Sequence, residues 1–232
     1  MPADAQDIEA PLSAFATRKA ELLFREALPC LGCHQLNGNG GRVGPDLTTV
    51  RTRRSTAYIA AMVADPQRTV PGTPMPRTAM PEATRDLIVR YLVTHSRPST
   101  SAVGAPPGVV PSARPASRDA PTLYAQYCAA CHGAAGRGDG ANAAYLPVKP
   151  AVHTSSNAMS RRSDDALYDT IAGGGAIMNR SPRMPAFGAT LSGTEIRSLV
   201  AYIRSLCACR GPAWSLTLDS AAGAPHRAPS PR

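Results

Sequence analysis

The pattern Cys-x-x-Cys-His occurs twice in this chain, at residues 30–34 and again at residues 128–132. With six Cys and five His among 232 residues, one chance match is expected in roughly three of a thousand sequences of this composition. Two matches are far rarer. Each half of the chain must therefore fold so that two thiols and the next imidazole face the same bound ligand.

The spacing of these side chains suits a porphyrin. Two thiols can add across its two vinyl groups, which places the adjacent imidazole over the iron. A redox pair, a zinc site or a disulfide could use the same cysteines, but none of them needs the following His. A thioredoxin-like site also needs a strand-helix-strand context, and zinc needs four ligands. The sequence predicts covalent haem attachment through Cys30 and Cys33, and through Cys128 and Cys131.

Composition divides the chain between the two motifs. The run from Ser96 to Ala120 is rich in Pro, Ser, Ala and Gly, and a second run of this kind begins near Gly211. Such segments do not hold a helix or bury a core. We predict a first domain over 1–96, a linker over 97–120, a second domain over 121–210 and a tail over 211–232.

Both domains repeat one order of parts: a helix, the motif, a Gly-rich loop, a middle helix, a Met-Pro loop and a last helix. This order indicates an internal duplication. Pro121 can open the first helix of the second copy. Ser55 and Ser163 can cap the middle helices, which we expect to end at Asp65-Pro66 and at Gly173.

The last helices are predicted after Pro81 and after a capping box at Ser192 and Glu195. No alternating pattern indicates a strand. Three Phe and one Trp make a thin protein core, so we expect a large cofactor to fill it. The predicted fold class is all-α, with two small helical domains joined by a Pro-rich linker.

A six-coordinate haem needs a second axial ligand, and a thioether sulfur keeps its potential high. In the second copy Met184 lies in a Met-Pro loop eighteen residues before Tyr202. The first copy has two such steps. Met75 lies sixteen residues before Tyr91, close to the second-copy spacing, whereas Met80 lies eleven before it. We predict Met75, with Met80 as the alternative. The remaining internal methionines are interpreted as core or loop residues, namely Met62, Met159 and Met178.

These residues carry a family resemblance. Each half resembles a class I cytochrome c domain, and the pair resembles the soluble two-domain dihaem cytochromes. The resemblance covers both halves but not the linker or the tail. It implies two covalently attached haem c groups, His34 and His132 as proximal iron ligands, and Met75 and Met184 as distal ones.

The resemblance also implies supporting residues. A Pro carbonyl commonly holds the proximal His ring in this family, and Pro45 in Gly44-Pro45-Asp46-Leu47 matches that element. In the second half Pro147 or Pro150 can serve. The family packs an aromatic residue of the last helix near the haem, where Tyr91 and Tyr202 stand.

Several residues lie outside the motifs. Cys-x-Cys is a poor disulfide geometry, so Cys207 and Cys209 are expected to be buried or tail cysteines, with a disulfide, a lipid or a metal attachment as alternatives. His95, His153 and His226 are expected on the surface or in loops. An iron-ligand role for His153 in place of Met184 is an alternative.

Charge limits the class of partner. Lys and Arg number 25 against 16 Asp and Glu, a net charge of +9 that is spread along the chain. A nucleic-acid partner is therefore not favoured. The excess is either a solvated basic surface or steers the protein toward an acidic redox partner or an anionic membrane face.

The predicted function is electron transfer rather than enzymatic catalysis, by a free carrier or by the cytochrome subunit of a membrane-bound oxidase or dehydrogenase complex. The alternative is a dihaem enzyme, peroxidase-like or thiosulfate-oxidising, with one open or non-Met haem.

No apolar stretch is long enough to span a membrane. Met1 to Asp7 lack the features of a secretory signal, so we expect any signal to be removed or to lie elsewhere. The resemblance implies a location in the periplasm or on the outer face of the cytoplasmic membrane.

Overall fold

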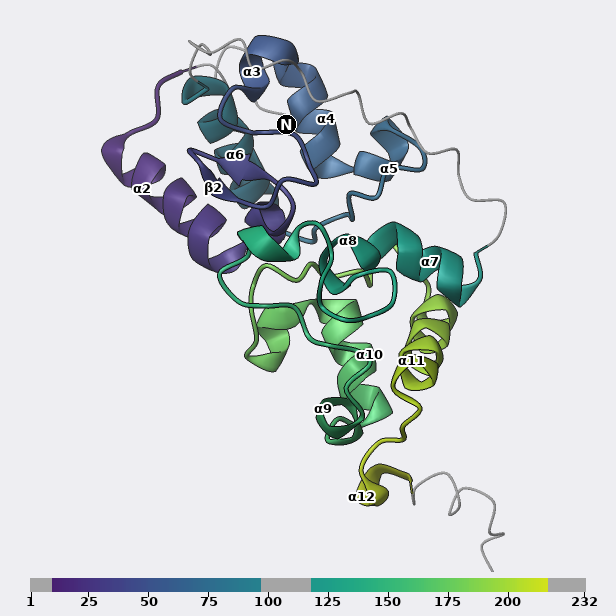
Figure 1. The fold of residues 1–232 in the computed structure, drawn as a ribbon. Helices are drawn as coiled ribbons and strands as arrows, with labels where there is room; N and C mark the ends of the chain where they lie inside the picture. Colours follow the sequence, from purple (N-terminus) through teal and green to yellow (C-terminus); the bar gives the residue numbers. More distant parts are fainter. Residues whose placement is uncertain (1–9, 97–117, 217–232) are drawn as a thin grey trace, which may run out of the picture.

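The computed structural model describes residues 10–96 and 118–216, and it contains two helical domains in direct contact (Figure 1). Strands are confined, within these residues, to a small antiparallel hairpin of β1 (Gln35–Leu36) and β2 (Asn39–Gly40). The predicted all-α class is confirmed, and this hairpin is its one exception in the described part. The predicted boundaries at residue 97 and residue 120 fall on or near residues outside these ranges.

The first domain contains seven helices and helical turns within residues 10–96. They are α2 (Ala14–Leu22), the π-helical turn η1 (Leu23–Ala27), the 3-10 turn η2 (Pro29–Gly32), α3 (Val50–Arg53), α4 (Thr56–Ala64), α5 (Pro66–Thr69) and α6 (Glu82–Thr94). The side chain of Ser55 caps α4 by accepting a 3.2 Å hydrogen bond from the amide of Tyr58, as the sequence predicts. Helix α4 ends before Asp65-Pro66, also as predicted, and α6 begins one residue after Pro81.

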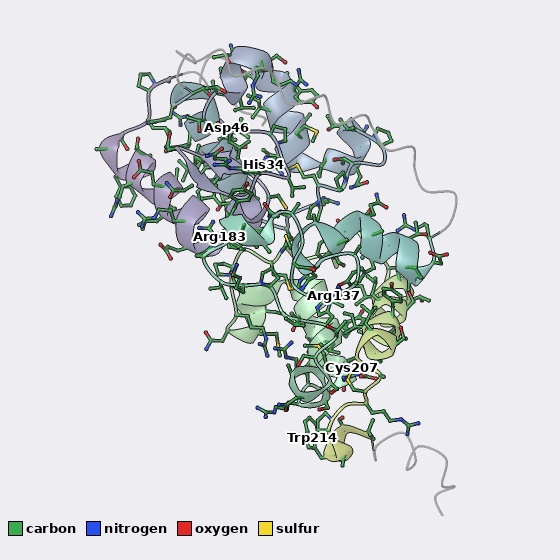
Figure 2. The ribbon with its side chains drawn as sticks, viewed as in Figure 1. His34, Asp46, Arg137, Arg183, Cys207 and Trp214 are labelled. Atoms are coloured by element: carbon green, nitrogen blue, oxygen red, sulfur yellow. A yellow bond between two sulfur atoms is a disulfide. The ribbon has the colours of Figure 1, made fainter. Side chains whose placement is uncertain are left out.

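The core of the first domain lies between α6, α2 and α4. Ala20 and Phe24, four residues apart, are fully buried there, and Ile88 and Tyr91 of α6 pack with them. Phe15, in the first turn of α2, is in contrast 78% exposed, so this apolar side chain lies on the solvent side of the helix. Figure 2 shows His34 within this domain and Arg183 at its border with the second.

The second domain has eight helical elements within residues 118–216. They are α7 (Ala120–Tyr127), α8 (Ala129–His132), η3 (Ala143–Tyr145), α9 (Ser156–Ser160), α10 (Asp164–Gly173), η4 (Gly175–Met178), α11 (Gly193–Cys207) and α12 (Ala213–Leu216). The predicted cap at Ser163 and the capping box of Ser192 and Glu195 are both present. Helix α7 starts one residue before Pro121, because Asp119 caps it. Helix α12 falls in the segment expected to be a tail.

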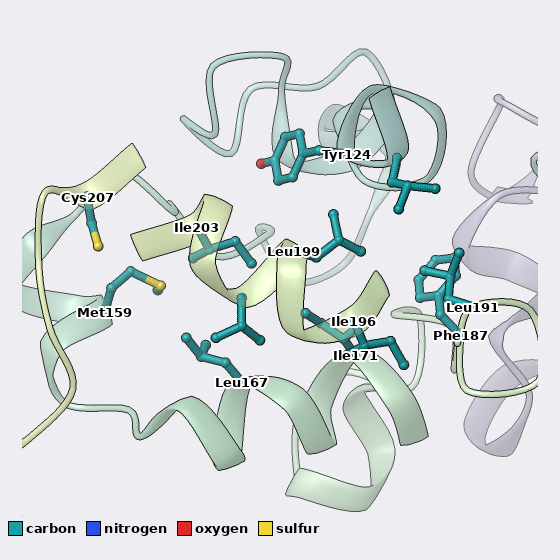
Figure 3. Close-up of a cluster of buried hydrophobic side chains, with 12 residues drawn as sticks. Tyr124, Met159, Leu167, Ile171, Phe187, Leu191, Ile196, Leu199, Ile203 and Cys207 are labelled. Atoms are coloured by element: carbon teal, nitrogen blue, oxygen red, sulfur yellow. The ribbon is translucent and has the colours of Figure 1, made fainter. Parts of the chain in front are cut away.

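The core of the second domain forms where α11 crosses α7, α9 and α10 (Figure 3). Its buried side chains include the fully enclosed Leu199 and Met159, which confirms the interpretation of Met159 as a core methionine. Residues from the Met-Pro loop, Phe187 and Leu191, close one end of this cluster. The loop that precedes α11 is thus anchored to the core.

Hydrogen bonds join the two domains along a continuous border. The side chain of Gln126 donates to the carbonyl of Gly72 over 3.3 Å, and the amide of Arg77 donates to Thr190 Oγ1 over 3.0 Å. The two domains are therefore docked, although the sequence alone allows many arrangements. Among the described residues, no helix has the length and apolar character needed to cross a membrane.

Candidate functional site

The first Cys-x-x-Cys-His motif lies on η2, and Pro29 opens this turn. The amides of Cys33 and His34 both donate to the carbonyl of Cys30, over 3.2 and 2.9 Å. This single turn brings the two thiols and the imidazole together, so local backbone geometry alone builds the attachment site.

The carbonyl of Pro45 lies 2.8 Å from Nδ1 of His34. Since a carbonyl can only accept, Nδ1 carries the proton and the lone pair is on Nε2, the atom that can bind a metal. This is the contact that the resemblance implies for Pro45. A Cβ atom at Gly44 would lie 2.5 Å from His34 Cε1 and Nδ1, so only glycine lets the loop approach the ring this closely.

The second motif spans the junction of α7 and α8. Here the amides of Cys131 and His132 donate to the carbonyl of Cys128, again over 3.2 and 2.9 Å. The two motifs therefore share one backbone geometry, which agrees with the duplication indicated by the sequence.

Nδ1 of His132 lies 2.9 Å from the carbonyl of Ala151. The expectation that Pro147 or Pro150 supplies this acceptor is wrong. The carbonyl of Pro150 lies on the Gly138 side of the loop instead, so the next residue presents its oxygen to the ring. The chemical result is the same as in the first domain, because Nε2 of His132 is left as the metal-binding atom.

Burial sets the protonation of both motifs. It raises the pKa of Cys30 to about 11 and the pKa values of Cys33 and Cys128 to about 12, and it also raises the pKa of Cys131. None of these four cysteines forms a disulfide. All four sulfur atoms are therefore available for thioether bonds.

Burial also lowers the pKa of His34 and of His132, although the hydrogen bonds to Pro45 and Ala151 oppose that shift. Both rings are therefore neutral near pH 7 and able to bind a metal. Within residues 10–96 and 118–216, no group of three or more His, Cys, Asp or Glu side chains is arranged to hold a metal ion by itself. The thiols and imidazoles fit covalent haem attachment.

Met184 belongs to a turn in which its amide donates to Ser181 and its carbonyl accepts from Gly175. Its side chain packs against the second-domain core. In the first domain Met80 packs against the core cluster, whereas the backbone of Met75 is held by Gln67 and Thr73. Ligand roles for Met184 and Met75, with Met80 as the alternative, stay predictions.

The aromatic residues of the last helices lie in the two cores. The ring of Tyr91 is buried, with its centroid 5.6 Å from that of Phe24 and 4.5 Å from that of His95. Tyr202 meets Tyr124 edge to face with centroids 5.2 Å apart. A contact of either tyrosine with haem remains a prediction.

His153 lies in a loop, as one of the two expectations from the sequence has it, but it is not a surface residue, since it is only 7% exposed. Its ring is stacked on that of His132, with centroids 4.2 Å apart, and its Nδ1 lies 2.9 Å from Tyr124 Oη. Two ligands on opposite faces of a haem cannot be stacked in this way. His153 therefore belongs to the surroundings of His132 and does not fit the alternative role as the opposite ligand.

Cys207 and Cys209 form a disulfide. The expectation of unpaired cysteines is wrong, because Ala208 adopts a left-handed conformation with φ of 47° and brings the two Cα atoms to 5.1 Å. This geometry lies at the end of α11, away from both motifs. No sequence pattern signals a left-handed alanine.

Comparison with protein families gives two matches in tandem. Residues 19–96 match the family described as Cytochrome c, and residues 115–203 match the family described as Cytochrome C oxidase, cbb3-type, subunit III. Each match contains one Cys-x-x-Cys-His motif and one Met-Pro loop. Neither the comparison with curated proteins nor that with solved structures gives a match.

Proposed function

Since this chain is a dihaem c-type cytochrome built of two tandem cytochrome c domains, we propose that it relays single electrons between redox partners with both irons in His/Met coordination. Haem supplies the one-electron chemistry, and the protein supplies ligands, a low-dielectric pocket and a docking surface. The observation that carries the proposal is the paired orientation of His34 and His132, each fixed through Nδ1 by a backbone carbonyl.

In this proposal some residues attach the haems and others bind the irons. Cys30, Cys33, Cys128 and Cys131 would hold the two haems through thioether bonds, and His34 and His132 would each bind one iron. Met75 and Met184, from the Met-Pro loops, would supply the other protein ligand of each iron. With both ligands supplied by protein, neither iron would be open to a substrate, and the protein would act as a relay rather than as an enzyme.

The partners of this relay are proposed from charge and from the second family match. A net charge of +9 favours fast encounter with an acidic surface. The family that matches residues 115–203 takes its name from a subunit of cbb3-type cytochrome oxidase. We therefore place this chain as a carrier to, or a subunit of, a terminal oxidase or dehydrogenase complex on the periplasmic side of the membrane.

The decisive experiment measures ligation and turnover in purified holoprotein. We expect low-spin ferric spectra for both haems, with the long-wavelength absorption band of methionine-sulfur ligation, and no turnover of peroxide or thiosulfate. Met184→Leu should remove the second-domain share of that band. Met178→Leu is the matched control, because Met178 lies in η4 beside the same loop, and it should leave the band unchanged.

A high-spin ferric haem in the wild-type protein, together with peroxide turnover, would support the dihaem enzyme instead. The partner proposal has its own test in the salt dependence of electron transfer to an acidic acceptor. Its rate should fall as ionic strength rises, and a rate independent of salt would remove electrostatic steering from the proposal.

A further inference from the structure

The side chain of Asn142, in the loop between α8 and η3, lies between the two haem-attachment motifs. It is 1% exposed. Its Nδ2 donates to the carbonyl of Gly32, which is inside the first motif, and lies 3.4 Å from Cys131 Sγ of the second motif. Its Oδ1 accepts a 2.8 Å hydrogen bond from the amide of Arg42. One amide group thus contacts both motifs.

The partners of this amide group are unevenly divided between the domains. Its two hydrogen bonds to backbone, at Gly32 and Arg42, cross the border, while the contact within its own domain is the weak one to Cys131 sulfur. Undocking would therefore exchange both of these backbone hydrogen bonds for bonds to water, and the net free energy that they contribute to the docked state would be lost. A role confined to folding of the second domain does not account for this arrangement.

The surroundings of Asn142 show that the two motifs are in close contact. A Cβ atom at Gly32 would lie 2.0 Å from the carbonyl oxygen of Arg183, so this position tolerates only glycine. Arg183 in turn donates from its guanidinium to the carbonyl of Phe24 over 3.1 Å. Arg183 directly precedes Met184, so the first domain also contacts the loop expected to ligate the second iron.

Two further contacts join the domains. The guanidinium of Arg42 lies over the ring of Tyr145, 4.5 Å from its centroid. Farther away, the amide of Arg77 donates to Thr190 Oγ1. The border thus also contains contacts that do not involve the side chain of Asn142.

We propose that Asn142 is a positioning residue that locks the two haem-attachment motifs against each other and so sets the rate of electron transfer between the haems. This rests on the relay function proposed above. The amide provides a hydrogen-bonded connection from the Cys131 sulfur to the backbone between Cys30 and Cys33. Its position would keep the cysteines that hold the two haems at the same border.

The test uses Asn142→Ala in the holoprotein and two measurements. The first is hydrogen exchange at the amides of Arg42 and Arg77. Arg42 loses its direct acceptor, but Arg77 is bonded to Thr190 and is affected only if the domains separate. We expect exchange at both to rise, by about tenfold at Arg77, the factor that corresponds to loss of one buried hydrogen-bond partner. The second is the rate of electron transfer between the haems after rapid photoreduction, which should fall.

Two variants make the result interpretable. Asn157→Ala removes an exposed asparagine side chain from α9 and should change neither measurement. Gly32→Ala leaves Asn142 intact but pushes the motif away from Arg183, and it should reproduce both changes. It serves as the test if Asn142→Ala fails to fold. Faster exchange confined to Arg42, or an unchanged inter-haem rate in both variants, would overturn the proposal.

The relay function and the lock fail in different ways. If the wild-type protein lacks methionine-sulfur ligation, the relay proposal fails before any variant is made. If wild-type ligation is as expected and persists in Asn142→Ala while the inter-haem rate is unchanged, only the lock fails.

Discussion

The ring of His153 is parallel to that of His132 within 14°, with the ring centroids 4.2 Å apart. Burial lowers the pKa of His153 to about 3, and the nearby His132 and Arg162 act in the same direction. The ring is therefore neutral near pH 7, and its Nδ1 finds a partner in the hydroxyl of Tyr124. A neutral, hydrogen-bonded imidazole supports the face of His132 without adding charge.

Removal of the Tyr124 hydroxyl should destabilise the second domain. In Tyr124→Phe the buried Nδ1 of His153 loses its partner, and we expect the free energy of unfolding to fall by about 1–3 kcal/mol. Tyr145→Phe is the control, because Tyr145 is 42% exposed. Denaturant unfolding of both holoproteins measures the difference. Equal stability of the two variants would show that the hydrogen bond to His153 contributes nothing.

Acid stability should depend on Glu195. The hydrogen bond from Arg118, and then the bonds from Ser192, hold the pKa of this carboxyl at about 2, below its usual value of 4.5. The folded state thus binds a proton less readily than the unfolded state. The resulting stability is complete above about pH 4.5 and is lost as the pH falls toward about 2.

The variant Glu195→Gln removes this dependence. We expect its free energy of unfolding to change less than that of the wild type between pH 4.5 and pH 2. Glu82→Gln is the control, since the Glu82 side chain is 74% exposed at the start of α6. Denaturant titrations across this pH range compare the three proteins. The same pH slope in Glu195→Gln and wild type would contradict the assignment.

Gly44 should be required for the orientation of His34. In Gly44→Ala the new methyl group would meet the imidazole at 2.5 Å, and either the loop or the ring must move. We expect a loss of about 1–3 kcal/mol in unfolding free energy and an altered ligand-field spectrum of the first-domain haem alone. In the control Gly193→Ala the nearest atom is the tip of Tyr168 at 3.0 Å. If Gly193→Ala lost as much unfolding free energy as Gly44→Ala, the close approach of Gly44 to His34 would not be the cause of the loss.

The sequence predicted the features whose causes are local. Ser55, Ser163 and Ser192 cap helices because an N-cap needs only a side-chain oxygen and the following amides. The two motifs have the same backbone turn because a few consecutive residues determine it. The carbonyl of Pro45 next to His34 is the contact that the family resemblance implied, and it too involves one short segment.

The sequence did not predict contacts between segments far apart in the chain. Asn142 and Gly32 are separated by 110 positions, and neither belongs to a periodic pattern. His153 is buried because the loop of Ala151 folds against α8 and α7, which no local signal encodes. The disulfide depends on a left-handed Ala208, a conformation that the residue type does not favour.

The first-domain methionines can be separated by variants that conserve volume. The side chain of Met80 packs against the first-domain core, which gives it a structural role. The side chain of Met75 is not part of that cluster, and the backbone of Met75 is held in its loop by Gln67 and Thr73.

We expect Met75→Leu to remove the first-domain share of the long-wavelength absorption band. Met80→Leu should keep the band and change the unfolding free energy by less than about 1.5 kcal/mol. Both spectra are measured on ferric holoprotein with the second-domain ligand Met184 intact. Loss of the band in Met80→Leu but not in Met75→Leu would assign the iron to Met80, and the spacing to Tyr91 would then be the wrong guide to this loop.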